Sequence, residues 1–227
     1  MLVRPEINLT LAEVQALATV IGLTGGPVLL SDDLPALPLQ RRKIAGILIP
    51  LIDQWATVID WFDRITPQYI HVDLEGTTWD WHLLTWFNWD DQPKDITLSP
   101  NDIHLPEGEY WASSFWGEQV QLMNDQVPYP STRVEAHSVI LLAVRRICYN
   151  SPQYLGSTLH LSQGLEVASW QERDDLRLKL ELPRLCDGEF GCYLPGDIKK
   201  HGQIRKPFPG MRLEKGDIAF LKNSIKR

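Results

Sequence analysis

A four-residue apolar run, residues 27–30 (Pro-Val-Leu-Leu), constrains the fold of this 227-residue chain more than any other stretch. Helical sequence lies on both sides of the run, and three polar residues, Ser31, Asp32 and Asp33, follow it directly. A continuous Val/Leu run between helices is typical of a parallel strand that is buried on both faces. In a (β/α)8 barrel, such a strand delivers the residues at its carboxyl end to the catalytic face. The sequence therefore predicts one barrel-like unit over residues 10–49.

Two helices are predicted to flank this strand. The first begins after Thr10, because Thr10 and Glu13 have the spacing of a capping box, and apolar residues then recur at helical spacing. The second begins at Pro38, whose missing N–H costs nothing in a first turn, and is closed by Pro50. Residues 1–50 are therefore the expected terminal βα unit of an incomplete (β/α)8 barrel.

The sequence changes character beyond an expected connecting segment, residues 51–75. Residues 79–89 are rich in residues that favour strands and show no helical period. From Leu176 to Leu182, leucines alternate with charged residues, which is the pattern of a half-exposed strand. Several such segments, separated by Pro, Gly and Asp, indicate an antiparallel β-sandwich over residues 76–227. The predicted fold is mainly β, with this sandwich preceded by a helix–strand–helix remnant of a barrel.

Composition argues against several classes of partner and location. The net charge of −7 leaves no excess of Lys and Arg for a nucleic acid or an anionic membrane surface. The first residues lack the apolar core of a signal peptide, and no apolar run is long enough to cross a bilayer. Three cysteines, Cys148, Cys186 and Cys192, form no paired motif and are expected to be reduced thiols. We therefore expect a cytoplasmic protein that binds neither nucleic acid nor membrane.

Familiar catalytic and ligand motifs are missing from the sequence. It contains no glycine-rich nucleotide loop and no nucleophile elbow, and its six histidines are too widely spaced for a short metal-ligand motif. We expect no cofactor and no metal, and the sequence gives no support for a metal site assembled only in three dimensions. A strand is expected at residues 158–162, in which His160 is either a ligand group or, more commonly, a hydrogen-bonded core residue.

Five residues are candidates for binding a sugar: Ser31, Asp32, Asp33, Trp79 and Trp81. At a barrel mouth the two carboxylates can bind hydroxyl groups, but carboxylates at strand ends more often accept hydrogen bonds from turns. Adjacent residues also cannot be the opposed carboxylates of a glycosidase, which lie roughly 5 Å or more apart. An exposed indole can stack on a sugar ring, whereas alternate residues of a strand point into the core. Both interpretations remain open for the tryptophans.

These stretches together resemble one enzyme family. Residues 25–35, with Gly-Gly-Pro followed by Leu-Ser-Asp-Asp-Leu-Pro, are similar to the last βα unit of melibiase-type α-galactosidases and related glycoside hydrolases. Residues 84–89 (Leu-Thr-Trp-Phe-Asn-Trp) and 155–164 look like the β-sandwich that follows the barrel in those enzymes. The family uses an Asp nucleophile and an Asp acid/base on earlier barrel strands, and no position here matches either motif. The resemblance therefore implies a C-terminal portion that carries no catalytic residue.

The resemblance has further implications for partners and activity. It implies an α-galactoside as the carbohydrate, and an upstream catalytic polypeptide or a second copy as the protein partner. We expect the chain by itself to be inactive and residues 1–50 to associate or be poorly ordered, because a lone strand and two helices leave apolar faces uncovered. Two alternatives stay open. One is a free-standing carbohydrate-binding or scaffold module, and the other is an enzyme whose site the sequence does not reveal.

Overall fold

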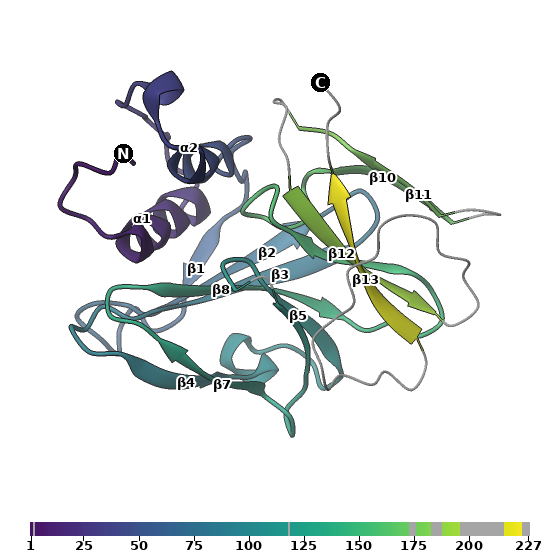
Figure 1. Cartoon of the computed structure of the whole chain (residues 1–227). Coiled ribbons are helices and arrows are strands. Elements are labelled where there is room, and N and C mark those ends of the chain that lie inside the picture. The colour runs from purple at the N-terminus through teal and green to yellow at the C-terminus, as the bar shows by residue number, and fades with distance from the viewer. Residues whose placement is uncertain (2, 118, 173–175, 183–187, 196–215, 224–227) are drawn as a thin grey trace.

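The computed structural model describes residues 1, 3–117, 119–172, 176–182, 188–195 and 216–223 (Figure 1). Two α-helices, two 3-10 turns and thirteen strands lie in these ranges. In chain order they are α1 (Leu11–Leu23), η1 (Leu34–Ala36), α2 (Leu39–Gly46), β1 (Ala56–Val58), β2 (Tyr69–Glu75), β3 (Asp80–Phe87), β4 (Lys94–Leu98), η2 (Pro100–Ile103), β5 (Tyr110–Ser114), β6 (Gln119–Met123), β7 (Tyr129–Val134), β8 (Val139–Arg146), β9 (Gln153–Ser157), β10 (Val167–Glu172), β11 (Leu176–Leu180), β12 (Gly188–Pro195) and β13 (Gly216–Asn223). The prediction of a mainly β chain with helices at its start is confirmed.

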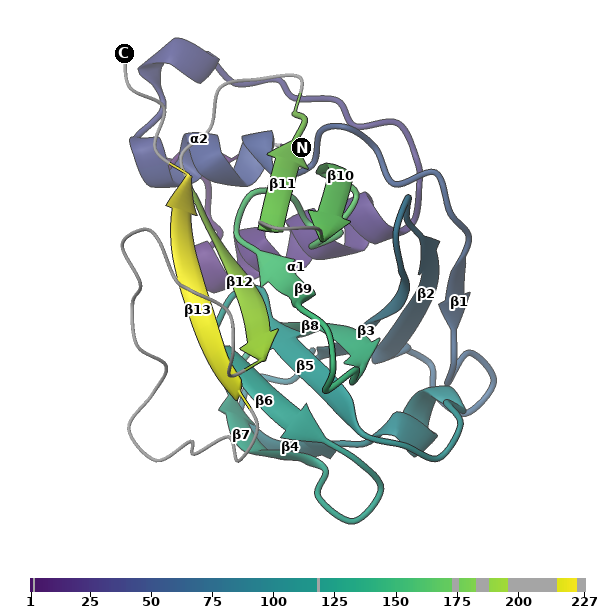
Figure 2. The same ribbon diagram turned by 90° about the vertical axis from the view of Figure 1, so that its right-hand side faces the viewer.

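The strands form four sheets, and the strand pairs of the described residues are antiparallel. The largest sheet has six strands in the order β1-β2-β3-β8-β5-β6. A three-stranded sheet has the order β13-β12-β9, and the pairs β4-β7 and β10-β11 complete the set. Figure 2 shows β12 and β13 beside β5 and β6, where Trp111, Val120, Leu155 and Tyr193 pack together.

Each face of the six-stranded sheet carries a hydrophobic cluster. Its first face packs against the helical segment, with Val72, Leu83 and Leu141 fully buried there. Its second face packs against β4, β7 and the η2 turn around Leu84 and Leu142. In Figure 1 the helices lie on one side of this sheet and β4-β7 on the other. Burying each large aliphatic side chain contributes about 1.5–3 kcal/mol, so the two clusters supply much of the stability of the fold.

Helix α1 covers the sheet and does not expose its apolar face. The Thr10 hydroxyl accepts a hydrogen bond from the Glu13 N–H and the Glu13 side chain accepts one from the Thr10 N–H, so the predicted capping box is present. Val14 and Ala18 are fully buried against the sheet, and the Trp116 indole donates to the Thr19 hydroxyl at 3.0 Å. The expectation of a bare apolar face is therefore wrong for α1, because the sandwich itself covers that face.

Residues 27–30 do not form the predicted strand. This extended stretch bonds to the first residue of the chain: the Met1 ammonium donates to the Leu29 carbonyl at 2.6 Å, and the Ser31 N–H donates to the Met1 carbonyl at 3.5 Å. A ladder requires a neighbouring strand, and in the described part of the chain none pairs with this run. The helix–strand–helix of the prediction is thus a helix, an extended segment and a helix.

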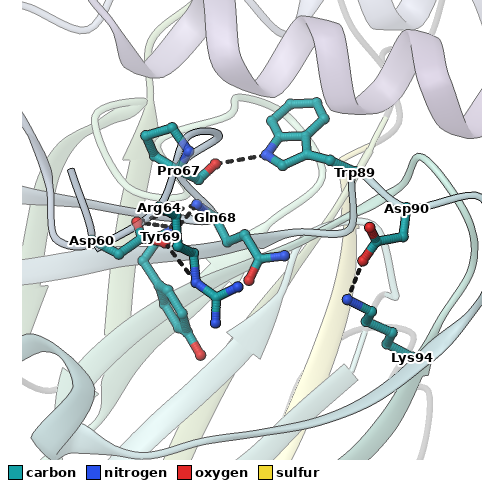
Figure 3. Close-up of polar contacts among 8 residues, drawn as sticks. All are labelled: Asp60, Arg64, Pro67, Gln68, Tyr69, Trp89, Asp90 and Lys94. Carbon is teal, nitrogen blue, oxygen red and sulfur yellow. Dashed lines mark hydrogen bonds and ion pairs between the residues drawn. The ribbon is translucent and has the colours of Figure 1, made fainter. Parts of the chain in front are cut away.

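The sandwich begins earlier than predicted, within residues 51–75. This expected connecting segment contains β1 and β2, both strands of the six-stranded sheet. The turn between them is held by Asp60, which is 6% exposed. Its carboxylate accepts hydrogen bonds from the Gln68 N–H at 2.9 Å and the Tyr69 N–H at 3.0 Å, and Arg64 lies 3.6 Å away (Figure 3).

The neighbouring loop is fixed to the same turn. Figure 3 shows the Trp89 indole pointing at Pro67, whose carbonyl accepts its hydrogen bond at 2.6 Å, and Lys94 paired with Asp90. The Trp89 ring also stacks on Phe87 with the centroids 4.9 Å apart. Phe87 and Trp89, at the end of the aromatic stretch, therefore serve the packing of the sandwich at this end of β3.

Two further features complete the comparison with the predicted elements. The alternating leucines form β11, as the period-two pattern predicts. Residues 158–162 are bends and turns that follow β9, so the strand predicted there is wrong. Among the described residues, no helix has the length and apolar character that a membrane span needs.

Candidate functional site

The polar residues after the apolar run serve the chain's own backbone. The Asp32 carboxylate accepts a hydrogen bond from the Val3 N–H at 2.5 Å and lies 3.7 Å from the Arg4 guanidinium. Its side chain is only 1% exposed, whereas Ser31 and Asp33 are exposed. Asp32 therefore holds the N-terminal residues against the loop, and the N–H group that it accepts from belongs to residue 3 rather than to the turn itself. Ser31 and Asp33 are the members of this group that a ligand can reach.

Trp79 and Trp81 lie next to each other around one small hollow. Gly76, Arg145, Tyr154 and Gly164 also line it, and it has room for about one water molecule. Trp81 is 3% exposed, and its indole donates to the Ser162 carbonyl at 2.8 Å. Trp79 is half-buried and meets Trp170 edge to face, with the ring centroids 4.7 Å apart. Trp81 is thus a core residue, and the hollow is too small for a sugar ring.

A buried charged network, which the sequence did not indicate, lies behind this hollow. Arg145 is 4% exposed, and its guanidinium sits 4.9 Å from the centre of the Trp81 ring. It donates to the Leu155 carbonyl at 2.8 Å and to the Gln163 carbonyl. Burial lowers the pKa of Arg145 to about 10, so the group stays charged at neutral pH. Backbone carbonyls and aromatic faces therefore stabilise a cation inside the sandwich.

Glu166 supplies the negative charge of the same network. Its carboxylate, 1% exposed, accepts hydrogen bonds from the Tyr154 hydroxyl at 2.7 Å, the Gly164 N–H at 2.7 Å and the Ser157 hydroxyl. Burial, and then the charge of Glu166, raises the pKa of Tyr154 well above its usual value. These donors occupy the carboxylate from within the fold, so Glu166 is suited to holding the loop together rather than to acid/base catalysis.

The polar segment of residues 155–164 is therefore structural. Gly164 must lack a side chain because a Cβ there would lie 2.6 Å from the Trp81 ring and 2.7 Å from the Arg145 guanidinium. His160, which is 1% exposed, has Nδ1 2.7 Å from the Ser162 hydroxyl and Nε2 2.6 Å from the Pro50 carbonyl oxygen. It joins this segment to the end of the helical region. An arginine at the end of an apolar strand is the sequence signal that could have pointed to such a network, because a buried guanidinium requires several hydrogen-bond acceptors nearby.

A second polar cluster lies on β2 and β3 and contains His71, Asp73 and His82. The nearest atoms of these three side chains lie within 4.8 Å of one another. The Asp73 Oδ1 is 2.6 Å from the His82 Nδ1 and 3.1 Å from the His71 Nε2. Burial lowers the pKa of His71, while the Asp73 carboxylate acts in the opposite direction. Two imidazoles and a carboxylate at one point can share a proton or coordinate a cation.

The fold is shared with solved glycoside hydrolases. A β-L-arabinopyranosidase of the GH27 family from Geobacillus stearothermophilus, in complex with arabinose, superposes with a TM-score of 0.50 at 12% identity, over 62% of this chain and 32% of that one. α-Galactosidase I from Mortierella vinacea gives 0.49 at 14% identity, over 63% and 38%. The α-galactosidase from Saccharomyces cerevisiae with raffinose gives 0.42 at 11% identity, over 63% and 45%.

The match to the GH27 arabinopyranosidase confirms the fold implied by the resemblance to melibiase-type enzymes. The chain has a fold found in GH27 glycoside hydrolases, and it spans about a third of the length of the arabinopyranosidase that it matches. No protein-family model and no curated protein matches the sequence itself.

Proposed function

We propose that this chain is the C-terminal portion of an α-galactosidase-like glycoside hydrolase and that it supports a separate catalytic barrel without contributing catalytic residues. The fold likeness to a GH27 enzyme supports the class. The carbohydrate would be an α-galactoside and the location cytoplasmic, in keeping with the resemblance and the composition. The observation that carries the proposal is the concentration of exposed apolar side chains in residues 29–65.

The exposed apolar side chains of this segment are large and numerous. Trp55 is 94% exposed, Phe62 96% and Ile65 fully exposed, while Leu29 is 74% exposed. Contiguous apolar patches on a surface mark sites that bind another protein, and we infer that these side chains belong to such a site. The segment follows α1, includes α2 and ends in the turn after β1, so it covers part of the predicted barrel-like unit and part of the predicted connecting segment. A catalytic polypeptide that covers this segment would remove those side chains from water.

The candidate sugar-binding residues favour a supporting role. Trp81 is in the core, the hollow beside Trp79 has room for about one water molecule, and Asp32 is bonded to the backbone. Glu166, the buried carboxylate next to the hollow, already accepts hydrogen bonds from other groups of this chain. None of these arrangements presents two opposed carboxylates to a glycosidic bond, which a glycosidase needs.

A free-standing carbohydrate-binding module is the second candidate. The exposure of Trp55 (94%) and of Trp61 (59%) favours it, because an exposed indole face stacks on a sugar ring. Titration of the chain with melibiose, followed by tryptophan fluorescence, separates the two candidates. Saturable binding that is lost in Trp55→Ala would favour the module, while no binding is expected for a supporting domain.

Association and activity test the main proposal directly. We expect the purified chain to self-associate or to bind an apolar dye, and to leave an aryl α-galactoside intact. The triple variant Trp61→Ser/Phe62→Ser/Ile65→Ser should be monomeric and bind less dye. Val127→Ser removes an apolar side chain that is 53% exposed elsewhere and serves as the matched control. A wild-type monomer that binds no dye, or hydrolysis of the galactoside by the chain alone, would overturn the proposal.

A further inference from the structure

We propose that His71, Asp73 and His82 form a binding site for a divalent transition-metal ion such as Zn²⁺ on the six-stranded sheet. This site is independent of the proposed supporting function, because it lies on β2 and β3 and uses none of the exposed apolar residues. Neither the sequence motifs nor the fold comparisons indicate it.

The strand register brings the three side chains to one face. His71 and Asp73 are two positions apart on β2, so their side chains point to the same side of the sheet. Asp73 is paired with His82 on β3, and side chains of directly paired residues also share a face. Val72 lies between His71 and Asp73 and is paired with Leu83 on β3. The side chains of Val72 and Leu83 point to the opposite face and are fully buried. The register therefore fixes which side chains meet.

The distances suit a tetrahedral ion. Between the nearest atoms, His82 and Asp73 are 2.6 Å apart, His71 and Asp73 3.1 Å, and His71 and His82 3.4 Å. Ligand atoms of a tetrahedral Zn²⁺ site, with bonds of roughly 2.0–2.1 Å, are about 3.4 Å from one another. The distance between His71 and His82 already has this value. Small rotations of the Asp73 side chain would lengthen its distances to the two imidazoles. Three protein ligands of this kind leave one position for water or a further ligand.

The surroundings hold the two imidazoles in place and leave the carboxylate open to solvent. β2 and β3 are inner strands of the sheet, between β1 and β8. The His71 side chain is 13% exposed and the His82 side chain 28%, while the Asp73 carboxylate is 73% exposed and can receive an ion from solvent. A rigid frame of this kind keeps the cost of ordering ligands low.

The donor set selects the kind of ion. Imidazole nitrogens prefer Zn²⁺, Ni²⁺, Cu²⁺ and Fe²⁺, whereas Ca²⁺ and Mg²⁺ prefer sites made of oxygen. Two nitrogens and one carboxylate oxygen therefore favour the first group. An ion there would bond β2 to β3 and stabilise the folded chain by mass action, by about 2.7 kcal/mol at a free concentration of one hundred times its Kd.

The competing explanation is a hydrogen-bonded cluster in which Asp73 accepts from both imidazoles and no ion binds. A matched pair elsewhere makes the two distinguishable. The His137 Nε2 lies 2.8 Å from the Asp91 Oδ1. This exposed pair has a His–Asp contact like those of the cluster but lacks a second imidazole. A cluster that only hydrogen-bonds predicts similar, weak Zn²⁺ binding for the two sites.

Calorimetric titration of the tag-free, chelator-treated full chain with ZnCl₂ tests the proposal. We expect one ion to bind, thermal unfolding to shift upward, and Co²⁺ to give the visible spectrum of tetrahedral nitrogen and oxygen coordination. Affinity should fall at least about 100-fold in His71→Asn/His82→Asn and at least about 10-fold in Asp73→Asn, since even changes to groups around a metal site cost about 10–100-fold. His137→Asn should leave binding unchanged. Circular dichroism without metal checks that each variant folds.

Three results would overturn the proposal. They are the absence of saturable Zn²⁺ binding, binding that survives the double His variant, and binding that His137→Asn weakens as much as Asp73→Asn does. None of these measurements depends on sugar binding or on association, so the metal site can fail while the proposed function stands, and the reverse also holds.

Discussion

Trp81 and Ser162 are joined by a 2.8 Å hydrogen bond from the indole Nε1 to the backbone carbonyl, across 81 positions of the sequence. The bond ties β3 to the turn-rich segment that follows β9. It places the indole under the Arg145 guanidinium, whose cation lies 4.9 Å from the ring centre. A residue that the sequence left open between sugar binding and packing is thereby assigned to the core.

Replacing Trp81 with Phe should destabilise the chain. The variant keeps an aromatic ring but leaves the buried Ser162 carbonyl without its donor, and an unsatisfied buried group costs about 1–3 kcal/mol. Denaturant unfolding measures the loss as a lower midpoint. Trp55→Phe changes an indole that is 94% exposed and should stay within about 0.5 kcal/mol of wild type. Equal effects of the two variants would contradict the core assignment.

Asp60 should be required for the turn that leads into β2. Asp60→Asn replaces one of the two acceptor oxygens with a donor that faces the Gln68 and Tyr69 N–H groups. Hydrogen bonds to a charged group contribute about 1.5–3 kcal/mol, so we expect a loss of that size in the free energy of unfolding. Asp63→Asn, three positions on and exposed, is the matched control and should be neutral. A neutral Asp60→Asn would show that the turn does not need the carboxylate.

Glu166→Gln should be among the most damaging single changes. It removes the negative charge near the buried Arg145 and places an amide among the Tyr154, Ser157 and Gly164 donors. A hydrogen bond to a charged group contributes about 1.5–3 kcal/mol, so disturbing a buried carboxylate that accepts three should cost at least that much. Thermal unfolding monitored by circular dichroism gives the comparison. Glu181→Gln, at an exposed pair with Lys179, should change stability little, and a similar result for both variants would rule out the network as a source of stability.

Cys192 should be unreactive in the folded chain. It is 1% exposed, and burial raises the pKa of its thiol to about 12, so almost no thiolate forms near pH 8. In Cys148→Ser/Cys186→Ser, which leaves Cys192 alone, a disulfide reagent should react only after unfolding. In Cys186→Ser/Cys192→Ser, the exposed Cys148 should react at once. Fast labelling of Cys192 in the native state would contradict the described packing.

The same thiol should make stability depend on alkaline pH. The pKa of Cys192 is higher in the folded chain than its ordinary value of 9.0, so the folded state favours the neutral thiol. The contribution is complete below about pH 9 and is lost as pH rises toward about 12. The fall in the free energy of unfolding between pH 9 and pH 11 should therefore be smaller in Cys192→Ala than in wild type. Identical slopes would show that the thiol does not titrate differently in the two states.

Three expectations from the sequence have different outcomes in the structure. The reduced-thiol expectation agrees with Cys148 and Cys192, which are free, while Cys186 lies outside the described residues. The apolar face of α1 was expected to be bare and is covered by the six-stranded sheet. The supporting role without catalytic residues is part of the proposed function.

The sequence by itself determined the features that depend on residues a few positions apart. The capping box of Thr10 and Glu13 and the alternating leucines of β11 are of this kind, because neighbouring residues alone set helix starts and strand faces. Only the tertiary structure decided which distant groups meet. Residues 27–30 have strand-like sequence but no strand to pair with, and His71, Asp73 and His82 meet only because β2 and β3 pair in one register. Hydrogen-bonded ladders and buried charges need partners from elsewhere in the chain. A local sequence pattern does not identify which distant residues those partners are.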